Sequence, residues 1–164
     1  MTDVVRQDSL PKKWRYVLAT TNPPQGDLDP VSKWLYLTRA GVLPMTLVAA
    51  GLAGLLAVYR DAGVDWWLFS LAAVGIVLAH MANNLMNDLF DLEVGTDRED
   101  YPRNLYSPHP VISGVVTRKQ LGIYALVVNF VCLGIMIYID RNTCLFQGFT
   151  ESPVFPDILI RSFI

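Results

Sequence analysis

Three long apolar stretches dominate the pattern of hydrophobic and polar positions along the chain. Residues 41–59, 66–87 and 121–139 contain no Asp, Glu, Lys or Arg. At about 1.5 Å per residue, each stretch is long enough to cross the roughly 30 Å hydrocarbon layer of a bilayer as a helix. The pattern therefore predicts an all-α fold, an integral membrane helical bundle with about three transmembrane helices.

The segments around these stretches are more polar. Residues 1–30 end in TTNPPQGDLDP, a loop composition, and we interpret them as a polar flexible arm. Residues 31–44 predict a short amphipathic helix at the headgroup level, with Trp34 and Tyr36 as interfacial anchors. Residues 140–164 show no sustained period. We expect them to be an irregular tail, and the chain to be a truncated form of a longer protein.

Composition agrees with a membrane protein. Of the 164 residues 52% are hydrophobic and 17% are charged, whereas soluble domains carry about 25% charged residues. The formal net charge of −2 gives no support for a nucleic-acid partner. Cys132 and Cys144 fit no metal or redox spacing, and we expect no disulfide.

The distribution of Lys and Arg predicts the orientation in the membrane. Six of them precede the first apolar stretch, and the first loop carries only Arg60. The second loop carries Arg98, Arg103, Arg118 and Lys119. Because basic residues collect on the cytoplasmic side, the amino terminus and the second loop are expected there.

An acidic segment follows the second apolar stretch directly. Asn84, Asp88 and Asp91 have helical spacing that places them on one face, and Asn87 flanks that face. Solvated carboxylates at a helix carboxyl terminus would oppose the helix dipole, which favours cations there. A structural network with the basic residues of the second loop is an alternative that stays open.

A divalent-cation site accounts for the acidic segment better than solvated carboxylates at a helix end do. Mg²⁺ takes hard oxygen ligands, typically one or two carboxylates, waters and substrate phosphates. The ligands from the protein would be the carboxylates of Asp88 and Asp91, with an amide oxygen of Asn84 or Asn87. Polar residues at membrane depth are expensive and usually functional. Basic residues nearby point to a polyanion held through the metal, such as the diphosphate of a lipid.

The stretch NNLMNDLFDLEVGTD, at residues 83–97, resembles the first aspartate-rich motif of the UbiA-type intramembrane prenyltransferases. Its spacing to Asp97 resembles the branch that prenylates 1,4-dihydroxy-2-naphthoate in menaquinone synthesis. The stretches WLYLTRAGVLPMT and SPHPVISGVVTRKQL resemble flanking segments of the family. The resemblance covers roughly residues 32–139 and makes residues 31–139 a partial prenyltransferase membrane domain.

The resemblance implies a larger helical bundle and a reaction within it. A polyprenyl group is transferred from a polyprenyl diphosphate to an aromatic quinone precursor, with Mg²⁺ as cofactor and the lipid bilayer as surroundings. The family has a second aspartate-rich motif, which this sequence lacks. Two other functions stay open: a non-catalytic membrane fragment that binds lipid diphosphate or a partner, and a cation-transport subunit.

The resemblance also implies roles for single residues. Asp88, Asp91 and Asp97 are the expected catalytic acids, and Asp88, Asp91 and Asn84 the expected metal ligands. The expected substrate contacts are Asn84, Asn87, Arg98, Arg103, Lys119 and Arg39. For Arg39, interfacial anchoring is an equal alternative. His109 is either a base or a structural loop residue, with the second preferred, and His80 is expected to hydrogen-bond within the bundle.

Overall fold

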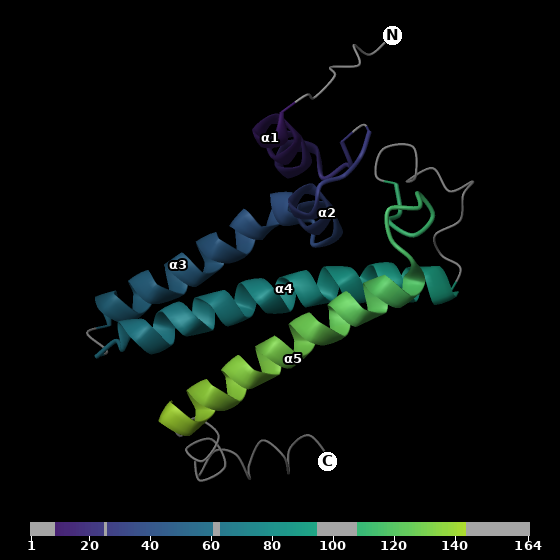
Figure 1. Ribbon diagram of the computed structural model, residues 1–164. Helices are drawn as coiled ribbons and strands as arrows, with labels where there is room; N and C mark the ends of the chain where they lie inside the picture. Colours follow the sequence, from purple (N-terminus) through teal and green to yellow (C-terminus); the bar gives the residue numbers. More distant parts are fainter. Residues whose placement is uncertain (1–8, 25, 61–62, 95–107, 144–164) are drawn as a thin grey trace, which may run out of the picture.

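The computed structural model describes residues 9–24, 26–60, 63–94 and 108–143, and its elements are all helical (Figure 1). In chain order they are α1 (Leu10–Thr20), α2 (Pro30–Leu37), the short 3₁₀ helix η1 (Ala40–Val42), α3 (Leu43–Tyr59), α4 (Trp66–Val94) and α5 (Arg118–Thr143). Three helices in these ranges are long and apolar enough to cross a membrane. The predicted all-α membrane bundle is therefore confirmed.

The three long helices lie side by side, with α4 in contact with both α3 and α5 (Figure 1). Successive helices run in opposite directions. The second apolar stretch ends at residue 87, and α4 continues beyond it to Val94, as the helical spacing of Asn84, Asp88 and Asp91 predicts. Hydropathy falls after residue 87, whereas the helical hydrogen bonds depend only on the backbone. The acidic residues thus lie on the last turns of a continuous helix.

Most of the surface of α3 and α5 is apolar and exposed. Leu55, Leu56 and Phe130 are each more than 60% exposed. In the most apolar 18-residue part of each long helix, only 17% of the residues of the first, 17% of the second and 11% of the third are buried. Such side chains are stable against lipid tails, since hydrocarbon requires only that the backbone hydrogen bonds be satisfied internally. The chain is an integral membrane protein.

Residues 1–30 were expected to be a polar flexible arm, but the described part of them contains helix α1. Its first turn holds Pro11, a residue tolerated where the N–H would lack a helical partner. Trp14 Nε1 donates to Asp29 Oδ2 at 3.0 Å, and the same carboxylate caps α2 through the N–H of Val31 and Ser32. Burial raises the pKa of Asp29, but a hydrogen bond from the Ser32 hydroxyl, together with the three above, outweighs it and lowers the pKa to about 2. One carboxylate thus ties α1 to the start of α2.

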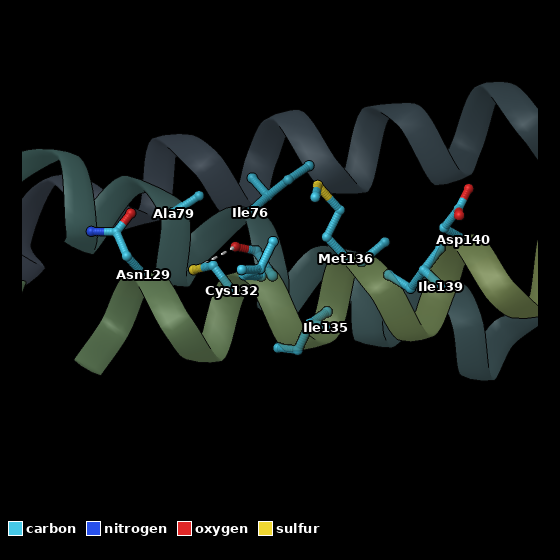
Figure 2. A pocket seen from close by; sticks show the side chains of 11 residues that line it. Ile76, Ala79, Asn129, Cys132, Ile135, Met136, Ile139 and Asp140 are labelled. Carbon is cyan, nitrogen blue, oxygen red and sulfur yellow. Dashed lines mark hydrogen bonds between the residues drawn. The ribbon is translucent and has the colours of Figure 1, made fainter. Parts of the chain in front are cut away.

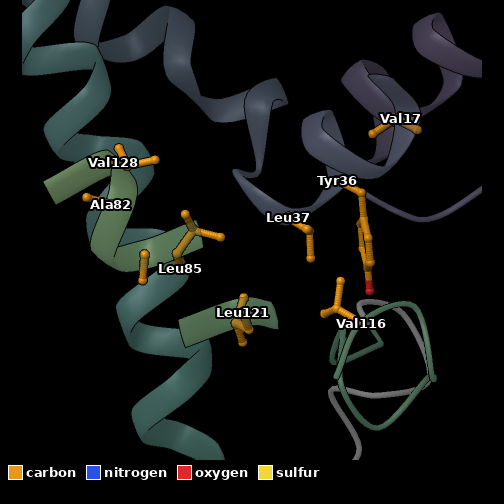
Figure 3. Close-up of a cluster of buried hydrophobic side chains, with 9 residues drawn as sticks. Val17, Tyr36, Leu37, Ala82, Leu85, Val116, Leu121 and Val128 are labelled. Carbon is orange, nitrogen blue, oxygen red and sulfur yellow. The ribbon is translucent and has the colours of Figure 1, made fainter. Parts of the chain in front are cut away.

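A compact core lies at the end of the bundle where α1 and α2 meet α4 and α5 (Figure 3). It contains Val17, Tyr36, Leu37, Ala82, Leu85, Val116, Leu121, Ala125 and Val128. The fully buried leucines Leu37, Leu85 and Leu121 are held there by van der Waals packing. Trp34 of α2 adds an edge-to-face contact with Tyr124 of α5, at a centroid distance of 6.1 Å. The core fixes α2 against the end of α4 that carries the acidic residues.

The docking of α1 requires a glycine in η1. A Cβ atom on Gly41 would lie 2.3 Å from the carbonyl oxygen of Leu18 in α1. Because that neighbour is backbone, no side-chain rotation relieves the contact. Gly41 therefore permits the close approach of α1 to η1.

We expect Gly41→Ala to separate α1 from η1 and lower the free energy of unfolding by roughly 1–3 kcal/mol, a typical effect of overpacking. Thermal unfolding in detergent measures the stability. Trypsin cleavage at the basic residues of α1 measures its release.

Gly51→Ala is the matched control. No atom lies within 4 Å of a Cβ at Gly51, so this change should be neutral or stabilise the exposed helix by up to about 1 kcal/mol. Equal behaviour of the two variants would contradict the assigned contact.

Candidate functional site

An ion pair joins α4 to the junction between α2 and η1. The side chain of Asp88 is 1% exposed and accepts a hydrogen bond from the guanidinium of Arg39, which is 29% exposed. A buried carboxylate is costly unless a partner compensates its charge. Arg39 supplies that charge, so its position is not explained by interfacial anchoring alone.

The backbone at Arg39 adopts a rare conformation. Its φ angle of 51° lies in the left-handed region, which residues other than Gly seldom enter. The N–H of Arg39 donates to the carbonyl of Tyr36 at 3.0 Å, closing the turn between α2 and η1. Strain of this kind, about 1–3 kcal/mol, persists where the surroundings over-determine the conformation. Here the turn directs Arg39 toward Asp88.

The residue before Arg39 contacts α4 one turn earlier. The Nδ2 group of Asn84, a 7% exposed residue, donates to the carbonyl of Thr38 at 2.9 Å. The sequence predicted no role for Thr38, because its contact is made by the backbone carbonyl, which every residue type carries. Asn84 was expected as a metal ligand. Its amide nitrogen holds the α2–η1 turn, and the predicted metal ligand is its amide oxygen, so that prediction stands.

One more turn toward the amino terminus of α4, His80 continues the same polar face. Its Nδ1 lies 2.6 Å from the hydroxyl of Thr46 in α3. The expected hydrogen bond of His80 within the bundle is confirmed. Residues 80, 84 and 88 thus form a polar ladder, with each side chain bonded to the α2–α3 part of the chain.

The segment that precedes α5 contacts the same site. The Tyr36 hydroxyl donates to the carbonyl of Pro108, and His109 Nε2 lies 2.7 Å from the backbone carbonyl oxygen of Asp88. Tyr36, expected as an interfacial anchor, is 3% exposed. Burial, and to a lesser degree the charge of Asp88, raise the pKa of Tyr36 to about 12. The hydroxyl therefore keeps its proton and remains a donor.

The other expected site residues are less enclosed. Asp91 is partly exposed on the last turns of α4, and Asn87 is exposed on the same helix. Lys119 is exposed in the first turn of α5. Asp97, Arg98 and Arg103 lie outside the described residues. Of the expected site residues within the described ranges, the structure gathers Arg39, Asn84 and Asp88 around the α2–η1 turn.

The donor set of the described residues has the chemistry that Mg²⁺ requires. Asp88 and Asp91 offer hard carboxylate oxygens three residues apart on one helix. Within residues 9–24, 26–60, 63–94 and 108–143, no group of three or more Asp, Glu, His or Cys side chains forms a metal cage. Two carboxylates suffice where substrate phosphates and waters complete the coordination. These residues therefore fit a metal held jointly with an anionic substrate.

A separate apolar groove of about 770 Å³ opens between α4 and α5 (Figure 2). On α4 it is lined by Ala72, Gly75, Ile76 and Ala79. Gly75 and Asp88 are thirteen residues apart, which at 3.6 residues per turn places them roughly 140° apart around the helix. The groove therefore faces away from the polar ladder and is not part of the ion-pair site.

Comparison with known proteins identifies a family. A sequence model of the UbiA prenyltransferase family matches residues 43–150, more than half of the chain. The match is to the family as a whole and gives no support for the narrower 1,4-dihydroxy-2-naphthoate branch. No curated protein and no solved structure gave a significant match.

We expect Arg39→Gln and Asp88→Asn each to lower the free energy of unfolding by roughly 1–3 kcal/mol, because each leaves a polar partner uncompensated. The double variant should lose less than the sum, with a coupling of at least about 0.5 kcal/mol. Chemical unfolding in mild detergent measures all three.

Lys119→Gln serves as the control, since removal of an exposed charge usually changes stability by less than about 0.5 kcal/mol. Strict additivity of the Arg39 and Asp88 variants would rule out a stabilising ion pair.

Proposed function

The chain belongs to the UbiA prenyltransferase family, and on that premise we propose that it acts in transfer of a polyprenyl group from a polyprenyl diphosphate to an aromatic quinone precursor within the membrane. The observation that carries the proposal is the buried Asp88 paired with Arg39 on the last turns of a membrane-spanning helix. Ionisable residues in such segments are rare and usually serve a function.

We assign the acidic residues to the diphosphate end of the substrate. Asp88 and Asp91 would hold Mg²⁺, with Asn84 orienting the pair and Asp97 supporting it. The metal, when bound, acts as a Lewis acid that offsets charge on the departing diphosphate. The carboxylates suit this task because Mg²⁺ keeps several positions open for phosphate oxygens.

The basic and amide groups would bind the diphosphate directly. Arg39 is suited to this because its guanidinium presents several donors in a planar fork and is 29% exposed beside Asp88. Arg98, Arg103, Lys119 and Asn87 are the further candidates for contact with phosphate oxygens. The membrane helices around the site would exclude water, which would otherwise trap the allylic cation that forms as the C–O bond breaks.

The same proposal includes an orientation. The amino-terminal segment and the second loop, from the end of α4 to the start of α5, carry most of the Lys and Arg near the membrane spans, and so would lie on the cytoplasmic side. A soluble diphosphate product would then leave directly into the cytoplasm.

Binding of a lipid diphosphate without turnover is the alternative to transfer. Capture of the substrate and its turnover are therefore measured separately.

Membranes containing the chain should retain radiolabelled farnesyl diphosphate in the presence of Mg²⁺ and release it on addition of EDTA. Asp88→Asn and Asp91→Asn should each weaken this retention by roughly 100-fold or more, because each removes a charged oxygen ligand. Transfer of the label to an aromatic acceptor, assayed in the same membranes, reports turnover.

The control is Asp65→Asn at the other end of α4. Asp65 Oδ1 accepts from the N–H groups of Trp67 and Leu68, a cap that Asn can also provide. Retention should therefore be unchanged in this variant. Mg²⁺-independent retention, or retention unaffected by both acidic-site variants, would refute the diphosphate site.

A further inference from the structure

We propose that His109 is a positioning residue, which holds the turn of α4 that carries Asp88 by a hydrogen bond to the Asp88 backbone. The functional importance of this residue rests on the proposed diphosphate site. The contact itself is a property of the fold: His109 is 3% exposed, and its Nε2 lies 2.7 Å from the Asp88 carbonyl oxygen.

The partners of His109 decide which ring nitrogen carries the proton. The Asp88 carbonyl can only accept, so Nε2 must donate. At the other nitrogen, the N–H of Val111 donates to Nδ1 at 3.2 Å. The ring is therefore the neutral tautomer with its proton on Nε2. Since both nitrogens are already engaged, His109 is not a general base toward the substrate.

The bond restrains the part of α4 where helices ordinarily fray. Asp88 lies six residues before the end of α4 at Val94, fewer than two helical turns. A carbonyl oxygen has two lone pairs, so it can accept the helical N–H four residues ahead and a second donor from outside the helix. The imidazole thus adds an external support close to the helix terminus.

The His109 hydrogen bond is one of several contacts that connect Asp88 to two other segments of the chain. Arg39 holds the Asp88 carboxylate, while His109 holds the Asp88 carbonyl. Pro108, covalently joined to His109, accepts from the hydroxyl of Tyr36, and helix α2 leads from Tyr36 back toward Arg39. Side chain and backbone of Asp88 are therefore fixed from two different segments. This arrangement suits a carboxylate that must point in one direction to bind its ligand.

Two substitutions of similar size separate the two hydrogen bonds of the ring. In His109→Gln, the amide nitrogen can occupy the place of Nε2 and donate to the Asp88 carbonyl. In His109→Asn, the shorter amide reaches only the place of Nδ1 and keeps the Val111 contact. If the Asp88 bond carries the positioning role, Gln restores it and Asn does not.

The first measurements need no ligand. The chain has two histidines, so ¹⁵N NMR of the histidine-labelled protein in nanodiscs identifies His109 as the signals lost in the Gln variant. We expect the Nε2–H tautomer. Amide hydrogen exchange over residues 88–94 should be roughly fivefold faster in the Asn variant and near wild type in the Gln variant, as loss of one hydrogen bond predicts. An Nδ1–H tautomer, or equal exchange in the two variants, would overturn the proposal.

The second measurement uses magnesium pyrophosphate as the probe, with binding followed by calorimetry. Loss of a residue that orients a metal ligand typically weakens metal affinity 10- to 100-fold. We expect about tenfold weaker binding for His109→Asn and little change for His109→Gln. Equal binding by both variants and the wild type would overturn the positioning role while leaving the diphosphate site intact. Failure of the wild type to bind would refute the diphosphate site, and the tautomer and exchange data would then decide the structural claim alone.

Discussion

The burial of one carboxylate constrains the arrangement of this protein. Asp88 is almost fully enclosed on a membrane-spanning helix, where an uncompensated charge would be very unfavourable. The guanidinium of Arg39 compensates it, and that contact requires a left-handed turn between α2 and η1. The turn is held in place because α2 packs through Tyr36 and Leu37 into the core at the same end of the bundle.

The two ends of the bundle differ in how they obtain stability. At the acidic end, α1, α2 and the segment before α5 contribute to a compact core (Figure 3). At the same end the α2–η1 turn bonds the side chains of Asn84 and Asp88, and His109 bonds the Asp88 backbone carbonyl. Elsewhere α4 contacts α3 and α5, and the three helices expose apolar side chains. The exposed apolar side chains of the second region are stable in lipid, whereas the polar side chains at the acidic end need protein partners. The precise geometry of the chain is therefore concentrated where the proposed chemistry occurs.

The proposed function explains why a polar ladder is maintained in such a place. An allylic diphosphate has an anionic head and a long apolar tail, so its site must join a charged region to hydrocarbon. The polar face of α4 meets that need at the membrane boundary, with Arg39 and Asp88 supplying charges of both signs. The apolar groove between α4 and α5 is turned away from this face, so it is not a direct continuation of the head-group site.

The sequence alone determined the three spanning helices, the acidic segment at the end of the second one, and the family resemblance that the comparison supports. These features are local, because hydropathy and helical spacing are read from neighbouring residues. Only the tertiary structure decided that Arg39, forty-nine residues earlier, is the partner of Asp88. It also revealed α1 and the contacts of Thr38 and His109 with α4. Contacts to backbone carbonyls across distant segments depend on how the helices pack, and no side-chain pattern in the sequence records them.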